Sequence, residues 1–169
     1  MEKIAENIAC SEGRYENFSG VIMWGDNEGI VENAKFILAE RFGLKLITFY
    51  FGTWVNGYWK YGIWESGYWK DGVWESGFWV NGIWWDGTWK YGIWKCGIWK
   101  DGTWKDGVWD DGHWWGGEWE HGTWMNGTWM NGIWEDGIWD DGVWENGIWK
   151  TGCDRNERAR IVNPNNWKK

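Results

Sequence analysis

The chain has few of the residues that usually build catalytic, metal or disulfide sites, with one proline, two histidines and three cysteines among 169 residues. Cys10, Cys96 and Cys153 are widely separated and odd in number, so they indicate neither a disulfide framework nor a zinc knuckle. No run of 18 apolar residues occurs, and the first residues lack the basic and apolar regions of a signal peptide. We therefore expect a soluble protein that is not exported, has no membrane segment and resides in a reducing compartment.

Positive charge is missing from the second half of the chain. Between Asp106 and Trp149 there are ten acidic residues and no lysine or arginine, and the formal net charge of the whole chain is −8. Such a negative field disfavours nucleic acid or an anionic membrane as a direct partner of this half.

The chain is instead very rich in glycine and tryptophan, with 27 and 24 residues respectively. From Gly52 to Gly152 a glycine recurs at every fifth position, and a tryptophan follows two places after each glycine except the last. The glycines lack the three-residue spacing and the prolines of collagen. Twenty Gly-x-Trp units without an insertion predict a repeat architecture that is one elongated body.

Each five-residue unit contains a short strand and a turn. The residues beside tryptophan include many isoleucines, valines and threonines, and the residue before glycine is Asn or Asp in twelve of twenty units. An antiparallel β-meander of very short hairpins, joined by two-residue loops, is the alternative fold. In a strand of three residues, however, the backbone groups of the first and last residues point to the same side, so hydrogen bonding to one of the two neighbouring strands would be lost. The pattern therefore favours an all-β solenoid whose units pair in parallel with the coils before and after.

The array resembles the pentapeptide-repeat proteins, which have a large apolar residue at the centre of each unit and a small residue two places earlier. Trp54 to Trp149 match the centre positions and the glycines match the small positions. The resemblance implies a four-sided β-helix with both residues pointing inward. The spacing is also similar to the Gly-x-Trp-x-x-Gly core of MORN repeats, although their longer unit is absent.

A thirty-residue echo conflicts with four sides. Comparing residues 60–86 with the stretch thirty later gives six matches at seventeen variable positions, against three matches at a shift of twenty. Lys60 and Lys90 match in this way, as do Trp85 and Trp115. Thirty residues is not a whole number of twenty-residue coils, so either the duplication ignored the phase of the coil or the coil is not four-sided.

Three regions follow from the pattern. Residues 1–51 do not repeat and are predicted to be an N-terminal α/β cap, with an amphipathic helix over 28–42 and a strand over 44–51 that leads into the array. The helix prediction rests on Val31, Ala34, Leu38 and Phe42. Residues 52–152 form the array, and 153–169 are a basic polar tail that is either a second cap or disordered.

The array tryptophans are predicted to be the core. Ordering about 100 residues costs on the order of 100 kcal/mol or more, and twenty buried indoles supply a hydrophobic term of about that size. No other apolar set in the array is large enough. Trp85 and Trp115 each follow a framework tryptophan directly and are expected to point outward.

We predict no catalytic residues, no cofactor and no metal. His113 and His121 lie among acidic residues, but residues on the outside of a regular array are usually solvated. Asp110-Asp111-Gly and Asp140-Asp141-Gly lack the ligand spacing of calcium loops and are expected to form turns.

The functional expectation is a non-catalytic structural or protein-interaction module with a protein partner or self-assembly. Gly-x-Trp arrays look like products of tailed phages, which implies a virion or phage-associated component, otherwise a cytoplasmic one. One alternative is an acidic nucleic-acid mimic that regulates a DNA-binding enzyme, as some pentapeptide-repeat proteins do; another is a carbohydrate-binding protein. The candidate interaction residues are Trp85, Trp115, Asp110, Asp111, Asp140 and Asp141.

Overall fold

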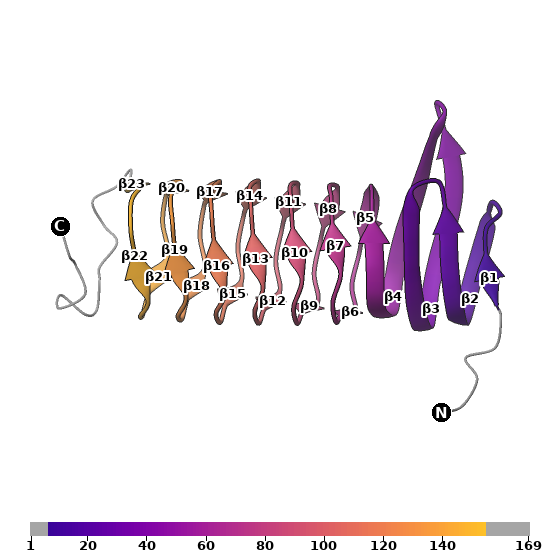
Figure 1. Cartoon of the computed structure of the whole chain (residues 1–169), viewed down its shortest axis with the longest axis horizontal. Helices are drawn as coiled ribbons and strands as arrows, with labels where there is room; N and C mark the ends of the chain where they lie inside the picture. The colour runs from indigo at the N-terminus through magenta and orange to yellow at the C-terminus, as the bar shows by residue number, and fades with distance from the viewer. Residues whose placement is uncertain (1–6, 155–169) are drawn as a thin grey trace.

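The computed structural model describes residues 7–154 and is all-β over that range. It consists of an N-terminal set of longer strands followed by a parallel β-solenoid, and the coils of the solenoid advance along one straight axis (Figure 1). The longer strands are β1 (Ile8–Ala9), β2 (Gly13–Trp24), β3 (Asn27–Arg41) and β4 (Leu44–Trp59). The predicted solenoid is therefore confirmed, and the antiparallel meander is not the fold of the array.

One coil of the solenoid is fifteen residues long and has three sides. Each strand pairs in parallel and in register with the strand three places later, for example Trp84 with Trp99 and Trp99 with Trp114. The four-sided coil implied by the pentapeptide-repeat resemblance is therefore wrong for this chain. The thirty-residue echo spans two whole coils.

The three sides of the coil form three faces of the rod. The first face holds β5 (Gly62–Trp64), β8 (Phe78–Trp79), β11 (Ile93–Trp94), β14 (Val108–Trp109), β17 (Thr123–Trp124), β20 (Ile138–Trp139) and β23 (Cys153–Asp154). The second face holds β6 (Tyr68–Trp69), β9 (Ile83–Trp84), β12 (Ile98–Trp99), β15 (His113–Trp114), β18 (Thr128–Trp129) and β21 (Val143–Trp144). The third face holds β7 (Val73–Trp74), β10 (Thr88–Trp89), β13 (Thr103–Trp104), β16 (Glu118–Trp119), β19 (Ile133–Trp134) and β22 (Ile148–Trp149).

The backbone of each unit is bonded to the coil before it at two points. The residue before tryptophan donates to the glycine carbonyl sixteen residues earlier, as Ile98 N does to Gly82 O at 2.9 Å. The residue after tryptophan donates to an earlier tryptophan carbonyl, as Lys100 N does to Trp84 O at 2.8 Å. Strands of two residues are therefore sufficient, because the coils above and below satisfy their backbone groups.

The array tryptophans fill the interior in three columns, which confirms that they are the core. Every tryptophan that lies two places after a repeat glycine, from Trp54 to Trp139, has an exposed fraction of 0%. Trp99 is typical: its ring stacks on Trp84 and Trp114 at 4.8 Å and meets Trp94 and Trp104 edge to face at 6.0 Å. The stacking distance equals the spacing of paired strands, so ring stacking and backbone pairing are satisfied together.

Glycine is required at each corner for two reasons. Gly102 has φ of +112°, and a Cβ there would lie 2.4 Å from Gly87 O of the preceding coil. At other corners the indole is also close: a Cβ at Gly112 would lie 3.3 Å from Cζ2 of Trp109. Close approach of backbone and indole thus explains why no other residue occupies the fifth position.

β2, β3 and β4 continue the three-sided cross-section as antiparallel neighbours, and β1 pairs with β2 in parallel. β4 runs around all three sides, pairing on one edge with β3 and on the other with β5, β6 and β7. The first indole column extends into this region, since Phe49 stacks on Trp64 at 4.1 Å and Phe36 on Phe49 at 6.3 Å. The strand predicted over 44–51 is thus confirmed as the beginning of β4.

The predicted helix over 28–42 is wrong, because these residues lie in β3 and the turn that follows it. Buried residues alternate along β3, but Asn33 has φ of +48° and lies where the register with both neighbouring strands shifts. The extra residue separates Val31 from Ala34 by three positions, which gave a helix-like spacing to an alternating strand. Phe42, the last residue of the predicted helix face, is fully exposed. The tail, residues 153–169, is predicted from the sequence to be either a second cap or disordered. Of this tail, 155–169 lie outside the described residues.

Candidate functional site

The candidate residues lie in rows on the outside of the rod, and they divide between two faces. Asp110 and Asp140 occupy one row of the first face, two coils apart, while Asp111 and Asp141 occupy the corner that follows it. Trp85 and Trp115 both lie on the second face. The structure therefore groups the four aspartates at the first face and its corner, and it groups the two tryptophans on the second face. The two sets lie on different faces.

The corner aspartates form turns, as predicted. Asp111 Oδ1 accepts a hydrogen bond from Gly112 N at 2.7 Å, and Asp141 Oδ1 accepts one from Gly142 N at 2.8 Å. The positive φ lies on the glycine and not on the acidic residue. Asp110 on the adjacent row is ion-paired with Lys95 Nζ at 2.9 Å.

Trp85 and Trp115 point outward, as predicted, with exposed fractions of 51% and 45%. The side chain of Lys100, one coil from each, lies between them. Its Nζ is 3.1 Å from the ring centroid of Trp115 and 5.8 Å from that of Trp85. A cation over an aromatic face is worth about 0.5–1 kcal/mol at an exposed site, so the row has its own internal stabilisation.

Ion pairs between adjacent coils run along the third face. Glu75 accepts ion pairs from Lys60 at 3.1 Å and Lys90 at 3.3 Å, which are one coil before and one coil after it. The row continues with Lys105–Glu120 at 3.0 Å and Lys150–Glu135 at 2.6 Å. Opposite charges one coil apart attract, and Lys60, Glu75 and Lys90 alternate in this way, whereas Lys90 and Lys105, like Glu120 and Glu135, are neighbours of the same sign. The Lys60–Glu75–Lys90 alternation and the Trp85–Lys100–Trp115 row account for part of the thirty-residue echo.

Replacing Glu75 tests the contribution of its two ion pairs. Glu75→Lys should lower the free energy of unfolding by about 1–2 kcal/mol, because two ion pairs are lost and positions 60, 75, 90 and 105 then carry four ammonium groups in one row. Equilibrium denaturation should show the loss shrinking as salt is raised from low to molar concentration. Glu65→Lys on the first face, between Tyr50 and Val80 in its row, is the control and should change stability by less than about 0.5 kcal/mol. A salt-independent loss would contradict the electrostatic explanation.

The two histidines lie in different rows of the rod. His113 lies on the second face and His121 at the corner of the third, in the row that contains Asp106 and Asp136. Within residues 7–154 no group of three or more histidine, cysteine, aspartate or glutamate side chains is placed to hold a metal ion.

Asp136 is the acidic residue whose environment clearly favours its charged form. Hydrogen bonds from Gly137 N at 2.8 Å and Thr151 Oγ1 at 3.1 Å lower the pKa of this carboxyl, and His121 contributes in the same direction. A lowered folded-state pKa stabilises the fold above the unfolded value, near 3.9, and this contribution is lost as pH falls through the folded value.

This environment predicts a pH-dependent effect of Asp136→Asn. The variant should unfold at a lower temperature than the wild type at pH 6, and the difference should vanish below the carboxyl pKa, when the wild-type side chain is also neutral. Thermal unfolding followed by circular dichroism between pH 2 and 7 measures it. Thr151→Val removes one of the two donors and should move the onset of the loss to higher pH. A difference that is constant over this range would contradict the assignment.

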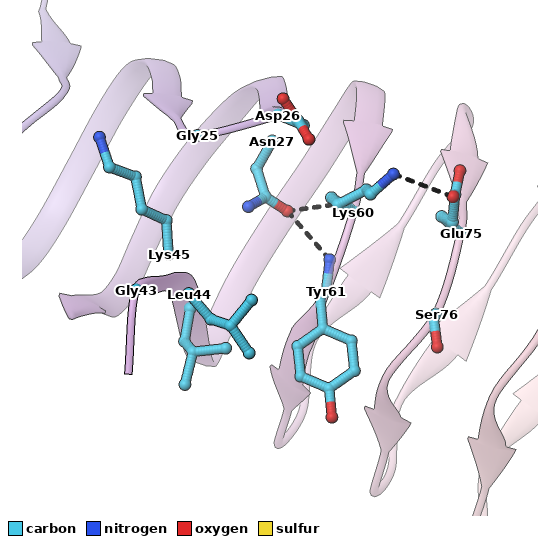
Figure 2. A pocket seen from close by; sticks show the side chains of 11 residues that line it. Gly25, Asp26, Asn27, Gly43, Leu44, Lys45, Lys60, Tyr61, Glu75 and Ser76 are labelled. Atoms are coloured by element: carbon cyan, nitrogen blue, oxygen red, sulfur yellow. Dashed lines mark hydrogen bonds and ion pairs between the residues drawn. The ribbon is translucent and has the colours of Figure 1, made fainter. Parts of the chain in front are cut away.

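The structure also has a pocket that the sequence did not indicate. It has a volume of about 460 Å³ and lies between the β3–β4 turn and the first corner of the third face. Figure 2 shows Leu44 and Lys45 on one side and Lys60, Tyr61 and Glu75 on the other. Buried Asn27 fixes the junction, because its Oδ1 accepts hydrogen bonds from Lys60 N at 2.7 Å and Tyr61 N at 3.3 Å. The residues come from four separate stretches, so no local motif marks them.

Comparisons with protein-family models, with curated proteins and with solved structures found no match. The repeat itself is plain in the structure: a five-residue unit with a tryptophan at each centre, three units to a coil. Residues 7–154 also contain no helix that could span a membrane.

Proposed function

We propose that the chain is a non-catalytic structural or protein-interaction module that presents side chains in fixed rows along a rigid rod. The observation that carries the proposal is the filled interior. Three columns of indoles with an exposed fraction of 0% leave the variable residues of the array on the outside, at coil spacings set by the backbone. Chemistry that needs a concave site has little room inside the filled coils.

The regular exterior supports recognition of a partner that is itself extended or repeated. Rows on the three faces differ in character, since the third face carries a row of ion pairs between coils and the second carries Trp85 and Trp115 around Lys100. One face can therefore bind while the others stay solvated. The similarity of Gly-x-Trp arrays to tailed-phage products leads us to propose a virion or phage-associated setting, and we retain a relationship to pentapeptide-repeat proteins as part of this proposal.

A photo-crosslinking experiment in cells that naturally make the protein tests the module. A photoreactive residue is placed at Val80 on the first face, at Trp85 on the second or at Lys105 on the third, all of which are exposed. We expect one face to give a discrete crosslinked protein and the other two to give none. Met125, on the first face like Val80, is the matched second position for that face. Equal, diffuse crosslinking from all three faces would contradict a docking module.

One observation favours an acidic mimic of nucleic acid as the second candidate. Asp110 and Asp140 lie on one face, with Asp111 and Asp141 at its corner. An inhibition assay with a type II topoisomerase tests it: inhibition that is lost on reversing these four charges supports the mimic, and no inhibition removes it. Carbohydrate binding is less well supported, because Trp85 and Trp115 both hold the ammonium group of Lys100 against a ring face.

A further inference from the structure

Packing alone does not explain why every core position of the array holds tryptophan. One coil before β5, strand β4 places Ile47 and Phe49 opposite the glycine and the tryptophan of β5. Both side chains are fully buried, and Phe49 stacks on Trp64 at 4.1 Å. The neighbouring strand β3 repeats this arrangement with Leu38 and Phe36. Phenylalanine with an aliphatic partner therefore fills the same place in the cross-section as tryptophan with glycine.

Tryptophan has a disadvantage in this interior that phenylalanine does not have. The indole N–H is a hydrogen-bond donor, and burying a donor without an acceptor is unfavourable. Of the eighteen tryptophans that lie two places after a repeat glycine, from Trp54 to Trp139, seventeen have no hydrogen-bond partner among the described residues, and Trp134 is the exception. Such groups are rare in native proteins and require an explanation. We look for it in a property of indole that phenylalanine and isoleucine lack.

That property is the ease with which indole loses one electron, and the rings are arranged to pass a charge on. The third column runs from Trp149 to Trp59 in six stacked steps of 4.8–4.9 Å, with ring planes 4–9° apart. Edge-to-face contacts join it to the other two columns, as Trp104 meets Trp99 at 6.0 Å and Trp109 at 5.9 Å. Electrons move readily between aromatic rings in contact. The columns are thus an unbroken path along the rod axis (Figure 1).

The interior also lacks a group that would trap the charge. An oxidised indole becomes fixed as a neutral radical when its N–H proton passes to a base. Among residues 7–154 the one buried polar or charged side chain is Asn27, which lies at the junction with the cap and is not a base. The oxidised indole therefore stays a radical cation, which can take an electron from the next indole in its column.

The two ends of the array differ in a way that gives the path a direction. At the C-terminal end, Trp149 is partly exposed and can exchange an electron with a molecule in solution. All six tyrosines of the chain lie at position 91 or earlier. Tyr58 directly precedes the last indole of the third column, and Tyr61 and Tyr68 nearby are exposed. An exposed phenol can release its proton to water as it loses an electron, so the charge stops there.

We propose that the array conducts oxidising equivalents through its indole columns, from a high-potential one-electron oxidant at the C-terminal end to the tyrosines near the cap. The oxidant, such as a ferryl haem or an oxidised metal complex, takes one electron from Trp149. Each indole then takes an electron from the next, with no bond made or broken and no proton moved. Finally a tyrosine such as Tyr58 gives an electron to the column and its phenolic proton to water, which leaves a neutral tyrosyl radical. A soluble thiol restores the tyrosine by donating a hydrogen atom.

Flash photolysis with an oxidant attached at one end tests the proposal in the full chain. In a Cys10→Ser and Cys96→Ser background, a ruthenium polypyridyl complex is attached to Cys153, which is exposed and lies on β23. A soluble electron acceptor converts the photoexcited complex to Ru(III). Transient absorption should show indole radicals first and tyrosyl radicals later, at a rate independent of protein concentration. Phenylalanine in place of all six tyrosines should abolish the later signal and prolong the earlier one.

Interrupting the columns tests the path itself. Trp99→Phe, Trp104→Phe and Trp109→Phe together remove one layer of oxidisable rings from all three columns, so the tyrosyl radicals should appear several-fold more slowly. Trp85→Phe with Trp115→Phe removes two indoles from the surface and should leave the rate unchanged. Circular dichroism shows whether each variant is folded, and the tyrosine variant changes none of the core.

Indole radicals that persist near the ruthenium complex and yield no tyrosyl radical would overturn the proposal. Tyrosyl radicals that appear at the same rate in the folded variant with the phenylalanine layer would overturn it too, as would a rate that rises with protein concentration. The path lies inside the rod, so it goes beyond the docking role of the faces. A chain that gives no crosslinks would still conduct, and the two proposals fail separately.

Discussion

Gly102→Ala is expected to lower the free energy of unfolding by about 3–5 kcal/mol, a large effect for the addition of one methyl group. The corner has φ of +112°, which an alanine adopts only with strain, and the new Cβ would lie 2.4 Å from Gly87 O. That contact is with the backbone of the preceding coil, where Gly87 O accepts a hydrogen bond from Thr103 N at 2.9 Å, so it is relieved only by separating two coils. Chemical denaturation followed by circular dichroism measures the loss.

Gly116→Ala is the matched control, because this glycine lies one position before a corner glycine. Its φ is not positive, and the nearest atom to a new Cβ is Lys100 O at 3.5 Å. Alanine there should be neutral or stabilising by up to about 1 kcal/mol, since it reduces the freedom of the unfolded chain. Equal losses at both positions would contradict the packing of glycine against the preceding coil.

Trp99→Ala, made as a single substitution, is expected to lower the free energy of unfolding by about 3–5 kcal/mol. This is the usual range when a large aromatic side chain is removed from a core. Trp99 contacts four other indoles, two by stacking at 4.8 Å and two edge to face at 6.0 Å, and each aromatic pair adds to the burial. Denaturation by guanidinium, followed by tryptophan emission, measures the change and shows whether emission of the native state is that of buried indole.

Trp115→Ala removes the same side chain from the surface. It loses the contact with Lys100 and should cost no more than about 1 kcal/mol. Similar losses for Trp99→Ala and Trp115→Ala would mean that the array indoles are not a core. Native emission at the wavelength of indole in water would lead to the same conclusion.

The solenoid and its core were predictable because each follows from a constraint on every unit. The backbone of a short strand between tight turns is paired fully only by coils, and only the indoles supply enough apolar area. The number of sides was not predictable from the five-residue period, which is the same for three or four units per coil. The thirty-residue echo contained this information, since Lys60, Glu75 and Lys90 alternate in charge one coil apart.

Two other features depend on tertiary contacts that a pattern does not contain. The register shift at Asn33 converted an alternating strand into a helix-like spacing, and only pairing with β2 and β4 reveals it. A buried indole N–H normally has a hydrogen-bond acceptor. Trp134 Nε1 donates to Thr151 O at 3.0 Å, whereas the other buried array indoles from Trp54 to Trp139 have no hydrogen-bond partner among the described residues. Their position is set by stacking, and Trp119 Nε1, for example, lies against the corner at Gly137.

The candidate residues were predicted in part. The outward direction of Trp85 and Trp115 follows from their place beside a framework tryptophan, and the turn role of Asp111 and Asp141 follows from the glycine after each. Their division between two faces required the length of the coil. The pocket beneath the β3–β4 hairpin required the cap strands, whose contacts join residues more than thirty positions apart.

The most direct test of the three-sided coil is disulfide formation from Cys96, which is exposed and free. In a background with Cys10→Ser and Cys153→Ser, Asp111→Cys places a second thiol fifteen residues away, and Gly116→Cys places one twenty residues away. The pairing of β11 with β14 puts positions 96 and 111 on adjacent coils, within the Cα separation that a disulfide spans. Mild oxidation should therefore link Cys96 within the chain in the Asp111→Cys variant and leave both thiols free in the Gly116→Cys variant. A disulfide in the Gly116→Cys variant and none in the other would show a four-sided coil and contradict this structure.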